Sequence, residues 1–236
     1  MKMFLITVVC SLFFALSADE SEATLYNFIE IRQKLPRNNK ITGKLPPDNV
    51  VHVLTFRFKK AIRKLPIEFV KKSGIRYVTF LTDLRLKRIP AAGLAHVDTI
   101  YLSTQHFSPK TIYHEIFHIF DSQSQNQEWC RLNAHKFVYT GSKFYEEDLS
   151  KREIKRKNNN LSTGKYTNDF VSRYAMSNER EDRAETFAYM VYEGSKFHLR
   201  TRNSYILRRK KEYIIKMTSQ KKLISKKFWY NKILAR

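Results

Sequence analysis

The segment from Ser108 to Asp121 constrains this chain more than any other, because it has the pattern of a half-buried helix with histidine and acidic residues among its apolar positions. Ser108 is a favourable N-cap residue, and Pro109 fits the first helical position. Apolar residues then recur at helical spacing, at Ile112, Ile116, Ile119 and Phe120. We therefore expect a helix that begins at Pro109 and places one face in the hydrophobic core.

The polar positions of this helix form the pattern His-Glu-x-x-His, at His114, Glu115 and His118. The two histidines are four residues apart, so one helical turn places them on a common face. Two imidazoles held in this way can bind one tetrahedral Zn²⁺ ion. Glu115 is next to the first histidine and is placed to take a proton from a water molecule rather than to bind the metal. The pattern predicts zinc as the cofactor and Glu115 as a catalytic base.

A catalytic zinc site needs a third protein ligand. The metzincin motif would supply it with Gly at position 121 and His at position 124, but the chain has Asp121 and Ser124 there, which excludes that class. A second helix is predicted from the apolar stripe Ala184, Phe187, Ala188 and Val191. Glu181 and Glu185 lie one turn apart on its neighbouring face, and spacing alone does not choose between them. Asp121 is a further acidic candidate for the third ligand. Its more ordinary role would be to accept a hydrogen bond at the end of the helix or from a ligand histidine.

The two motifs together resemble a known family of zinc peptidases. His114-Glu115-x-x-His118 is followed by Tyr174-x-x-Ser177-Asn178-Glu179-x-Glu181-x-x-Ala184-Glu185-x-Phe187. This series is similar to the zinc-peptidase domain of anthrax lethal factor and of related bacterial zinc-dependent peptidases, which are of the gluzincin type. The resemblance runs from about Gly93 to Val191.

The resemblance implies a role for three residues outside the first motif. Glu181 would be the third metal ligand, and Tyr174 would stabilise the tetrahedral intermediate or protonate the leaving amine. Glu185 would stand behind a ligand histidine and orient it. The resemblance also implies that a strand over 92–96 forms the edge of the cleft and pairs with an extended substrate backbone.

Length and periodicity predict one medium α+β domain. A chain of 236 residues with 42% hydrophobic residues can bury a sizeable core. Helices are expected over 49–65 and 66–70, and strands over 75–81, 92–96 and 99–103. With the resemblance, residues 49–193 are expected to form a zincin-like catalytic domain with a small antiparallel or mixed sheet and two active-site helices. Residues 19–48 are expected to form an extended lead-in with one short helix near Leu25 to Ile31.

The first 18 residues have the pattern of a secretory signal peptide, with a charged start, a short apolar run and small residues. They predict an exported protein that is secreted or extracellular. The apolar run is shorter than the roughly 20 residues of a membrane-spanning helix, so an uncleaved N-terminal anchor is only the alternative. Removal of this segment leaves Cys130 as the single cysteine, and no intramolecular disulfide can form.

Much of the formal net charge of +22 comes from residues 194–236, which contain fourteen Lys or Arg and one acidic residue, Glu212. Apolar residues are interleaved, so a basic helical C-terminal extension is expected. Such helices suit an anionic membrane surface or an acidic polymer, whereas a signal peptide argues against nucleic acid. The alternative is that the apolar side of these helices packs on the catalytic domain.

Two functions follow from these observations. The first is a secreted zinc metalloendopeptidase that hydrolyses peptide bonds in protein or peptide substrates. The second is a non-catalytic secreted protein that binds anionic surfaces through residues 194–236. The His114, Glu115, His118 and Glu181 set favours the first, because a scaffold needs no catalytic base. The sequence indicates neither the substrate nor the oligomeric state.

Overall fold

The computed structural model describes residues 26–36, 39–122, 128–135, 137–140 and 166–234. The signal peptide predicted over residues 1–18 lies outside these ranges. The described residues form a mixed α+β fold with seven α-helices and one six-stranded mixed sheet, which confirms the predicted fold class at that level. None of the helices in the described ranges combines the length and the apolar character that a membrane crossing requires.

The sheet is built around one long strand. The strands are β1 (Glu30–Ile31), β2 (Ile41–Lys44), β3 (Tyr77–Leu86), β4 (Ile89–Pro90), β5 (Gly93–His96) and β6 (Thr99–Ser103). The first part of β3 pairs in parallel with β1 and with β6, and β5 pairs antiparallel with β6. The later part of β3 pairs antiparallel with β2 and β4. This order, β1-β3-β6-β5, leaves β5 at one end of the sheet.

The stretch predicted as a lead-in contributes two strands to the sheet. From Tyr26 onward the expected short helix is not formed, and Glu30–Ile31 pair with β3 instead. Tyr26 is buried, and its hydroxyl donates a hydrogen bond to the carbonyl oxygen of Leu65 at 3.0 Å. Strand β1 has only two residues and β2 has one large apolar residue among four, so neither shows an alternating pattern.

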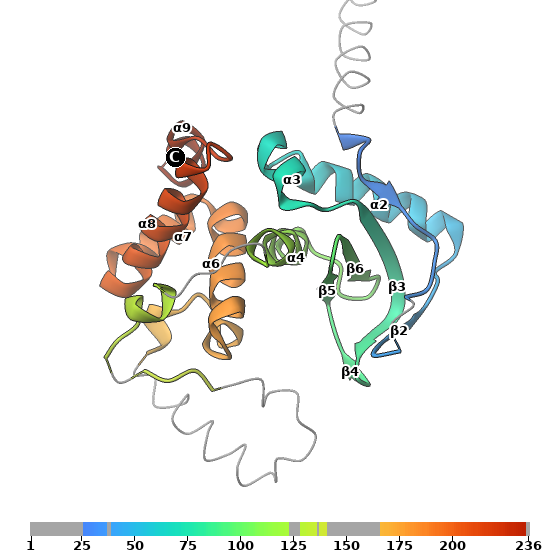
Figure 1. The fold of residues 1–236 in the computed structure, drawn as a ribbon, viewed down its shortest axis with the longest axis horizontal. Helices are drawn as coiled ribbons and strands as arrows, with labels where there is room; N and C mark the ends of the chain where they lie inside the picture. Colours follow the sequence, from blue (N-terminus) through green and yellow to red (C-terminus); the bar gives the residue numbers. More distant parts are fainter. Residues whose placement is uncertain (1–25, 37–38, 123–127, 136, 141–165, 235–236) are drawn as a thin grey trace, which may run out of the picture.

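The helix with the His-Glu-x-x-His pattern lies at the centre of the fold. It is α4 (Pro109–Asp121), and every residue from Ile112 to Asp121 is buried. Figure 1 shows α4 between the sheet on one side and α6 (Glu179–Glu193) on the other. The predicted helices over 49–65 and 66–70 are confirmed as α2 (Asp48–Ile62) and α3 (Ile67–Ser73), and both contact α4. Because α4 is enclosed on several sides, its polar side chains have fixed positions.

The C-terminal residues form three helices that share the core of the preceding residues. They are α7 (Ser195–Arg202), α8 (Tyr205–Gln220) and α9 (Lys226–Leu234). Their apolar side chains, among them Phe197, Ile214 and Trp229, are buried in the same cluster as the apolar residues of α4 and α6. The predicted boundary between residues 193 and 194 therefore lies within one continuous core.

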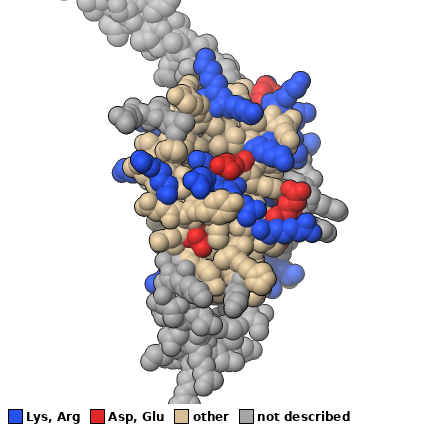
Figure 2. Space-filling view, turned by 90° about the vertical axis from the view of Figure 1, so that its left-hand side faces the viewer, with Lys and Arg blue, Asp and Glu red and all other residues tan. Residues whose placement is uncertain are grey.

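The outer faces of α7, α8 and α9 carry the basic residues of this region. The exposed ones are Lys196, Arg202, Arg208, Lys216, Lys221, Lys222, Lys226 and Lys227. Figure 2 shows the side of the molecule on which these helices lie, with Lys and Arg spread over it and Asp and Glu side chains among them. The basic residues are thus dispersed over this face and interrupted by acidic ones.

Candidate metal centre

The N-caps of α4 and α6 define where the two helices that carry the site residues begin. At the start of α4, the Ser108 hydroxyl accepts a hydrogen bond from the backbone N–H of Thr111 at 3.1 Å, as the N-cap prediction requires. At the start of α6, the side chain of Asn178 accepts hydrogen bonds from the N–H groups of Arg180 and Glu181, both at 3.0 Å. Each helix is therefore anchored one or two turns from the polar groups that it contributes.

Three ligand-type atoms of His114, His118 and Glu181 converge on one point. The Nε2 atoms of the two histidines are 2.9 Å apart, and each lies 3.0 Å from Oε2 of Glu181. In a tetrahedral zinc site with bonds of about 2.0–2.1 Å, neighbouring ligand atoms lie about 3.3 Å apart, so small side-chain rotations would open this triangle to fit the ion. Glu185 lies one turn further along α6 and does not join the triangle.

The polar contacts of His114 show why this cluster suits a cation. Its Nδ1 lies 3.0 Å from Oε1 of Glu185, an acceptor that holds a proton on Nδ1. The lone pair of Nε2 then points at the carboxylate of Glu181 and at the second imidazole. Such a meeting of electron pairs is repulsive unless a proton or a metal ion lies among them. Two imidazole nitrogens and one carboxylate oxygen are a donor set that zinc prefers.

The electrostatics of the cluster agree with this description. Burial lowers the pKa of His114, but contacts with Glu181 and Glu185 outweigh it and raise the pKa to about 10. Burial would raise the pKa of Glu181, but hydrogen bonds with the two histidines hold it far below its usual range. Without a metal, the cluster thus retains a proton on an imidazole beside an ionised carboxylate. A divalent cation at the same place would replace that proton.

Glu115 is close to the triangle but is placed differently from Glu181. Its carboxylate and the two histidines form a group in which one ligand atom from each lies within 4.8 Å of the others. Glu181 is much closer, at 3.0 Å, so Glu181 and not Glu115 completes the ligand triangle. Glu115 is 5% exposed, and burial raises its pKa although the histidines lower it. A buried carboxylate with a raised pKa beside a metal position is suited to accept a proton.

Glu115 is also in close contact with the edge strand. A Cβ atom added at Gly93 of β5 would lie 2.8 Å from both Cγ and Oε1 of Glu115. The carboxylate thus occupies the space that a side chain at position 93 would fill. Ala95, two residues further along β5, faces the same way and packs against the core. The first residue of β5 is therefore a glycine because the backbone and Glu115 approach so closely.

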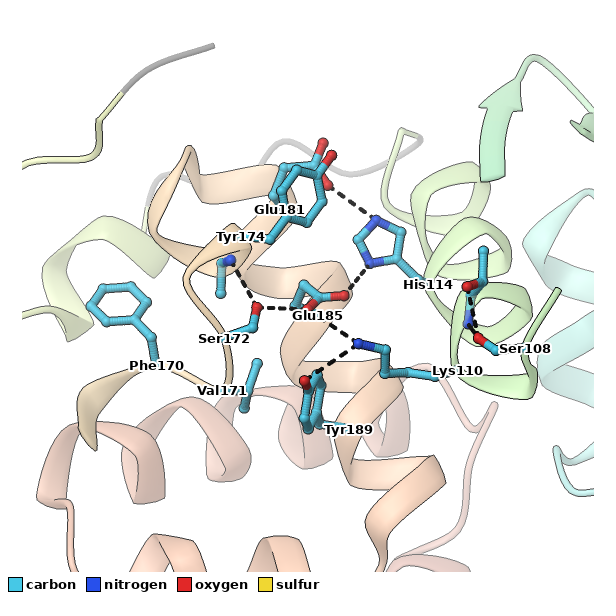
Figure 3. Close-up of polar contacts among 12 residues, drawn as sticks. Ser108, Lys110, His114, Phe170, Val171, Ser172, Tyr174, Glu181, Glu185 and Tyr189 are labelled. Carbon is cyan, nitrogen blue, oxygen red and sulfur yellow. Dashed lines mark hydrogen bonds and ion pairs between the residues drawn. The ribbon is translucent and has the colours of Figure 1, made fainter. Parts of the chain in front are cut away.

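Two other predicted site residues, Tyr174 and Glu185, lie around His114, and Figure 3 shows them. Tyr174 is on a short 3₁₀ turn before α6, and its ring centroid is 5.9 Å from that of His114. Glu185 binds Nδ1 of His114 with one oxygen, while the other accepts a hydrogen bond from Ser172 at 2.6 Å. Lys110 Nζ lies 3.8 Å from that second oxygen. Burial would raise the pKa of Glu185, but His114 and then Lys110 lower it, so it stays ionised and able to orient the imidazole.

Sequence reasoning did not identify Ser172 and Lys110. Lys110 lies one turn before His114 on the same helix, a spacing that could have indicated it. Ser172 lies in an irregular segment, where no periodic pattern marks a residue. Both were missed because their role depends on the approach of α6 to α4.

The structure places Asp121 away from the histidines. Its Oδ2 accepts from Arg183 of α6 at 2.8 and 2.9 Å, in an ion pair whose two side chains are nearly inaccessible. Asp121 therefore joins α4 to α6 rather than standing behind a ligand. Within the described ranges, the buried Nδ1 of His118 has no hydrogen-bond partner, and Nδ1 of His114 meets Glu185 in an ion pair that lacks regular hydrogen-bond geometry.

Comparisons with known proteins agree with the geometry of the site. A family model described as "putative zinc-binding metallo-peptidase" matches residues 92–232, which is more than half of the chain. The match begins beside the predicted start of the resemblance and continues through the basic C-terminal helices. It confirms the resemblance to a zinc metallopeptidase domain. The comparison with curated proteins found no match.

A solved structure has a similar fold. It is the crystal structure of a putative zinc-binding metallo-peptidase from Bacteroides caccae, with a TM-score of 0.55 and 14% sequence identity. The alignment covers 89% of this chain and 85% of the other. At this identity the likeness concerns the fold alone, and the family follows from the matched model. The chain belongs to the family of putative zinc-binding metallo-peptidases.

Proposed function

We propose that this protein is a zinc-dependent metallopeptidase of the gluzincin type that hydrolyses peptide bonds after export. The observation that carries the proposal is the convergence of His114 Nε2, His118 Nε2 and Glu181 Oε2 within 3.0 Å of one another, beside Glu115. His114, Glu115 and His118 have the spacing His-Glu-x-x-His, with Ile116 and Phe117 between them. Glu181 comes from a second helix, which is the gluzincin arrangement that the resemblance implies.

The residues of the chain divide the chemistry among them. Zinc bound by His114, His118 and Glu181 would supply the Lewis acid that polarises the scissile carbonyl and lowers the pKa of water to about 7. Glu115 accepts the proton of the attacking water and passes it to the leaving amine, a step commonly worth about 10²–10⁴-fold. Tyr174, next to His114, donates a hydrogen bond to the developing oxyanion.

The edge strand β5 is proposed to hold the substrate. Among the described strands it pairs only with β6, so its other edge has backbone groups available to an extended peptide. Pairing of this kind gives affinity through main-chain hydrogen bonds and makes few demands on the substrate sequence. The contact between Gly93 and Glu115 places this edge directly beside the proposed base.

The alternative function, binding of anionic surfaces by residues 194–236, has weaker support. Most apolar residues of α7, α8 and α9 are buried in the shared core or packed against it, and the exposed ones, Leu199, Tyr205 and Tyr230, are one on each helix, so these helices do not present a continuous apolar face to a membrane. The exposed basic residues are dispersed among acidic ones. Retention of the full chain on vesicles of anionic lipid, without any hydrolysis of peptides, would favour this alternative.

A peptide-hydrolysis assay tests the proposal. The mature protein should cleave members of a quenched fluorescent peptide library when zinc is present and lose this activity with a chelator. Glu115→Gln should retain the metal and lose at least about 10²-fold in kcat, because it removes the base and no ligand. Unchanged activity of Glu115→Gln would refute the mechanism. Export requires a separate test, namely N-terminal sequencing of the protein from the medium, which should show cleavage near residue 18.

A further inference from the structure

Asp182 follows the proposed third ligand, Glu181, in the sequence, and its side chain is bound by residues outside the metal centre. Asp182 is fully buried, and its Oδ2 accepts three hydrogen bonds from three different parts of the chain. The donors are Lys210 Nζ at 2.8 Å, Trp129 Nε1 at 2.8 Å and the Tyr139 hydroxyl at 2.7 Å. This carboxylate is therefore held far more firmly than that of an ordinary first-turn residue.

Lys210 belongs to α8 and is also completely buried. Its ammonium group donates a second hydrogen bond to the carbonyl oxygen of Asp169 at 3.1 Å and lies 3.4 Å from the ring centroid of Phe170. Lysine is almost never fully buried unless it is paired, because removing the charge from water is costly. Well-packed apolar residues in place of such a pair are often as stable or more so. The stability of the core alone therefore does not account for this ion pair.

The position of the Asp182–Lys210 ion pair on α6 suggests a second role for it. Consecutive residues on an α-helix point about 100° apart around the axis, since 3.6 residues make one turn. Glu181 faces the histidines of α4, and Asp182 faces α8. The next residue, Arg183, is bound to Asp121 of α4. A rotation of this first turn would break the bonds of Asp182 and at the same time move Glu181 relative to the two histidines.

We propose that Lys210 is a positioning residue of the metal centre. Through Asp182 it fixes the rotation of the first turn of α6, and so it holds Oε2 of Glu181 beside the histidine nitrogens. This inference rests on the zinc site proposed above. It gives α8, which contributes no ligand or catalytic group, a role in zinc binding. It also explains why this lysine is buried in a helix whose other basic residues are all exposed or partly exposed.

The test compares the metal centre of three full-length proteins. In the first variant Lys210→Met is combined with Asp182→Asn, so that no unpaired charge is left in the core. The control is Ile214→Ala, which removes a buried apolar side chain one turn further along α8, where the side chain makes no hydrogen bond with Asp182. Zinc affinity is measured by competition with a chelator. The visible absorption spectrum of the Co²⁺-loaded protein reports the ligand geometry, which a mere loss of stability does not change.

The paired variant should bind zinc about 10-fold more weakly and give an altered Co²⁺ spectrum. The control should keep both properties although it unfolds more readily. Wild-type affinity and spectrum in the paired variant would overturn the inference and leave the zinc site intact. Absence of metal binding in the wild type would overturn both. If the paired variant does not fold, Tyr139→Phe removes one donor to Asp182 and decides instead: a changed spectrum supports the inference, and an unchanged one refutes it.

Discussion

The contact between Gly93 and Glu115 leads to the sharpest prediction, which concerns Gly93→Ala. The new Cβ would lie 2.8 Å from Cγ and Oε1 of Glu115 and 2.7 Å from Cγ2 of Thr111. Carbon atoms in favourable contact are about 3.5–4.0 Å apart, so the side chains of Thr111 and Glu115 must each move by about 1 Å. Helix α4 is buried from Ile112 to Asp121 and cannot shift as a body. These two side chains are therefore the groups that will yield.

A displacement of this size has a calculable effect on the reaction. Misplacement of a reacting group by 1 Å can lower the rate about 10²-fold. The loss is expected in kcat, because Glu115 acts on the attacking water and does not bind the substrate. Overpacking of this kind costs roughly 1–3 kcal/mol of stability. The zinc content should not change, because the three atoms nearest to the new methyl group belong to Thr111 and Glu115 and not to a ligand side chain.

The assay is kcat and KM on a peptide substrate, together with metal analysis of the same preparation. Ala95→Gly is the matched control, because it changes the same face of β5 by one methyl group and does not crowd the base. We expect it to keep activity within a few-fold of wild type. Wild-type kcat in Gly93→Ala, or a parallel loss of zinc, would refute the reasoning from the contact.

Three further predictions concern the groups behind the site. Glu185→Gln should weaken zinc binding about 10–100-fold in a chelator competition, because the anionic acceptor for His114 Nδ1 is lost, and an unchanged affinity would contradict that role. In the metal-free protein, the pKa of His114 is raised from 6.5 to about 10, so its stabilising contribution is complete below pH 6.5 and disappears as the pH rises towards 10. Thermal melting should therefore show a steeper loss of stability over that interval in wild type than in His114→Gln, and equal slopes would argue against it. Arg183→Met should cost about 3–5 kcal/mol in urea unfolding because it leaves Asp121 buried without its partner, whereas adding Asp121→Asn should recover most of the loss; no recovery would show that packing and not charge is responsible.

Strong local signals explain which parts of the fold could be predicted. Helix α4 was predicted with its N-cap, because Ser108, Pro109 and the apolar positions that follow all indicate the same element. Strand β6 was predicted with its observed bounds, 99–103, from its β-branched and aromatic residues. Strand β1 was missed because two residues are too few to show a period, and β2 was missed because its four residues, Ile-Thr-Gly-Lys, contain one large apolar residue. They form strands because the longer β3 offers partners, which is information that their own residues do not contain.

The site residues also divide into those that a local sequence pattern identifies and those whose role depends on tertiary contacts. His114, Glu115 and His118 are close together in the sequence, and their spacing on one helix was sufficient to predict that they share a site. Glu181 and Glu185 are one turn apart on the same face, so periodicity could not say which of them meets the Nε2 atoms. Their positions along the contact between α4 and α6 make the difference, since Glu181 reaches Nε2 and Glu185 reaches Nδ1 of His114.

Asp182 and Lys210 could not be predicted, because a buried ion pair between distant helices leaves no periodic pattern in the sequence. Lys210 belongs to a run of basic residues, Arg208-Arg209-Lys210-Lys211, in which nothing marks it as the buried one. Its burial follows from the packing of α8 against α6. The segment that was predicted to be a separate basic extension therefore contributes to the support of the site.

The most direct test of the central claim is the zinc content of the purified mature protein, with wild type beside Glu181→Ala. The account predicts about one zinc per chain in wild type, bound by the two histidines and Glu181, and a sharp loss in the variant with the fold retained by circular dichroism. A wild-type protein that binds no zinc when it is supplied at neutral pH would contradict the account. Full zinc content in Glu181→Ala would also contradict it, because the third ligand would then lie elsewhere.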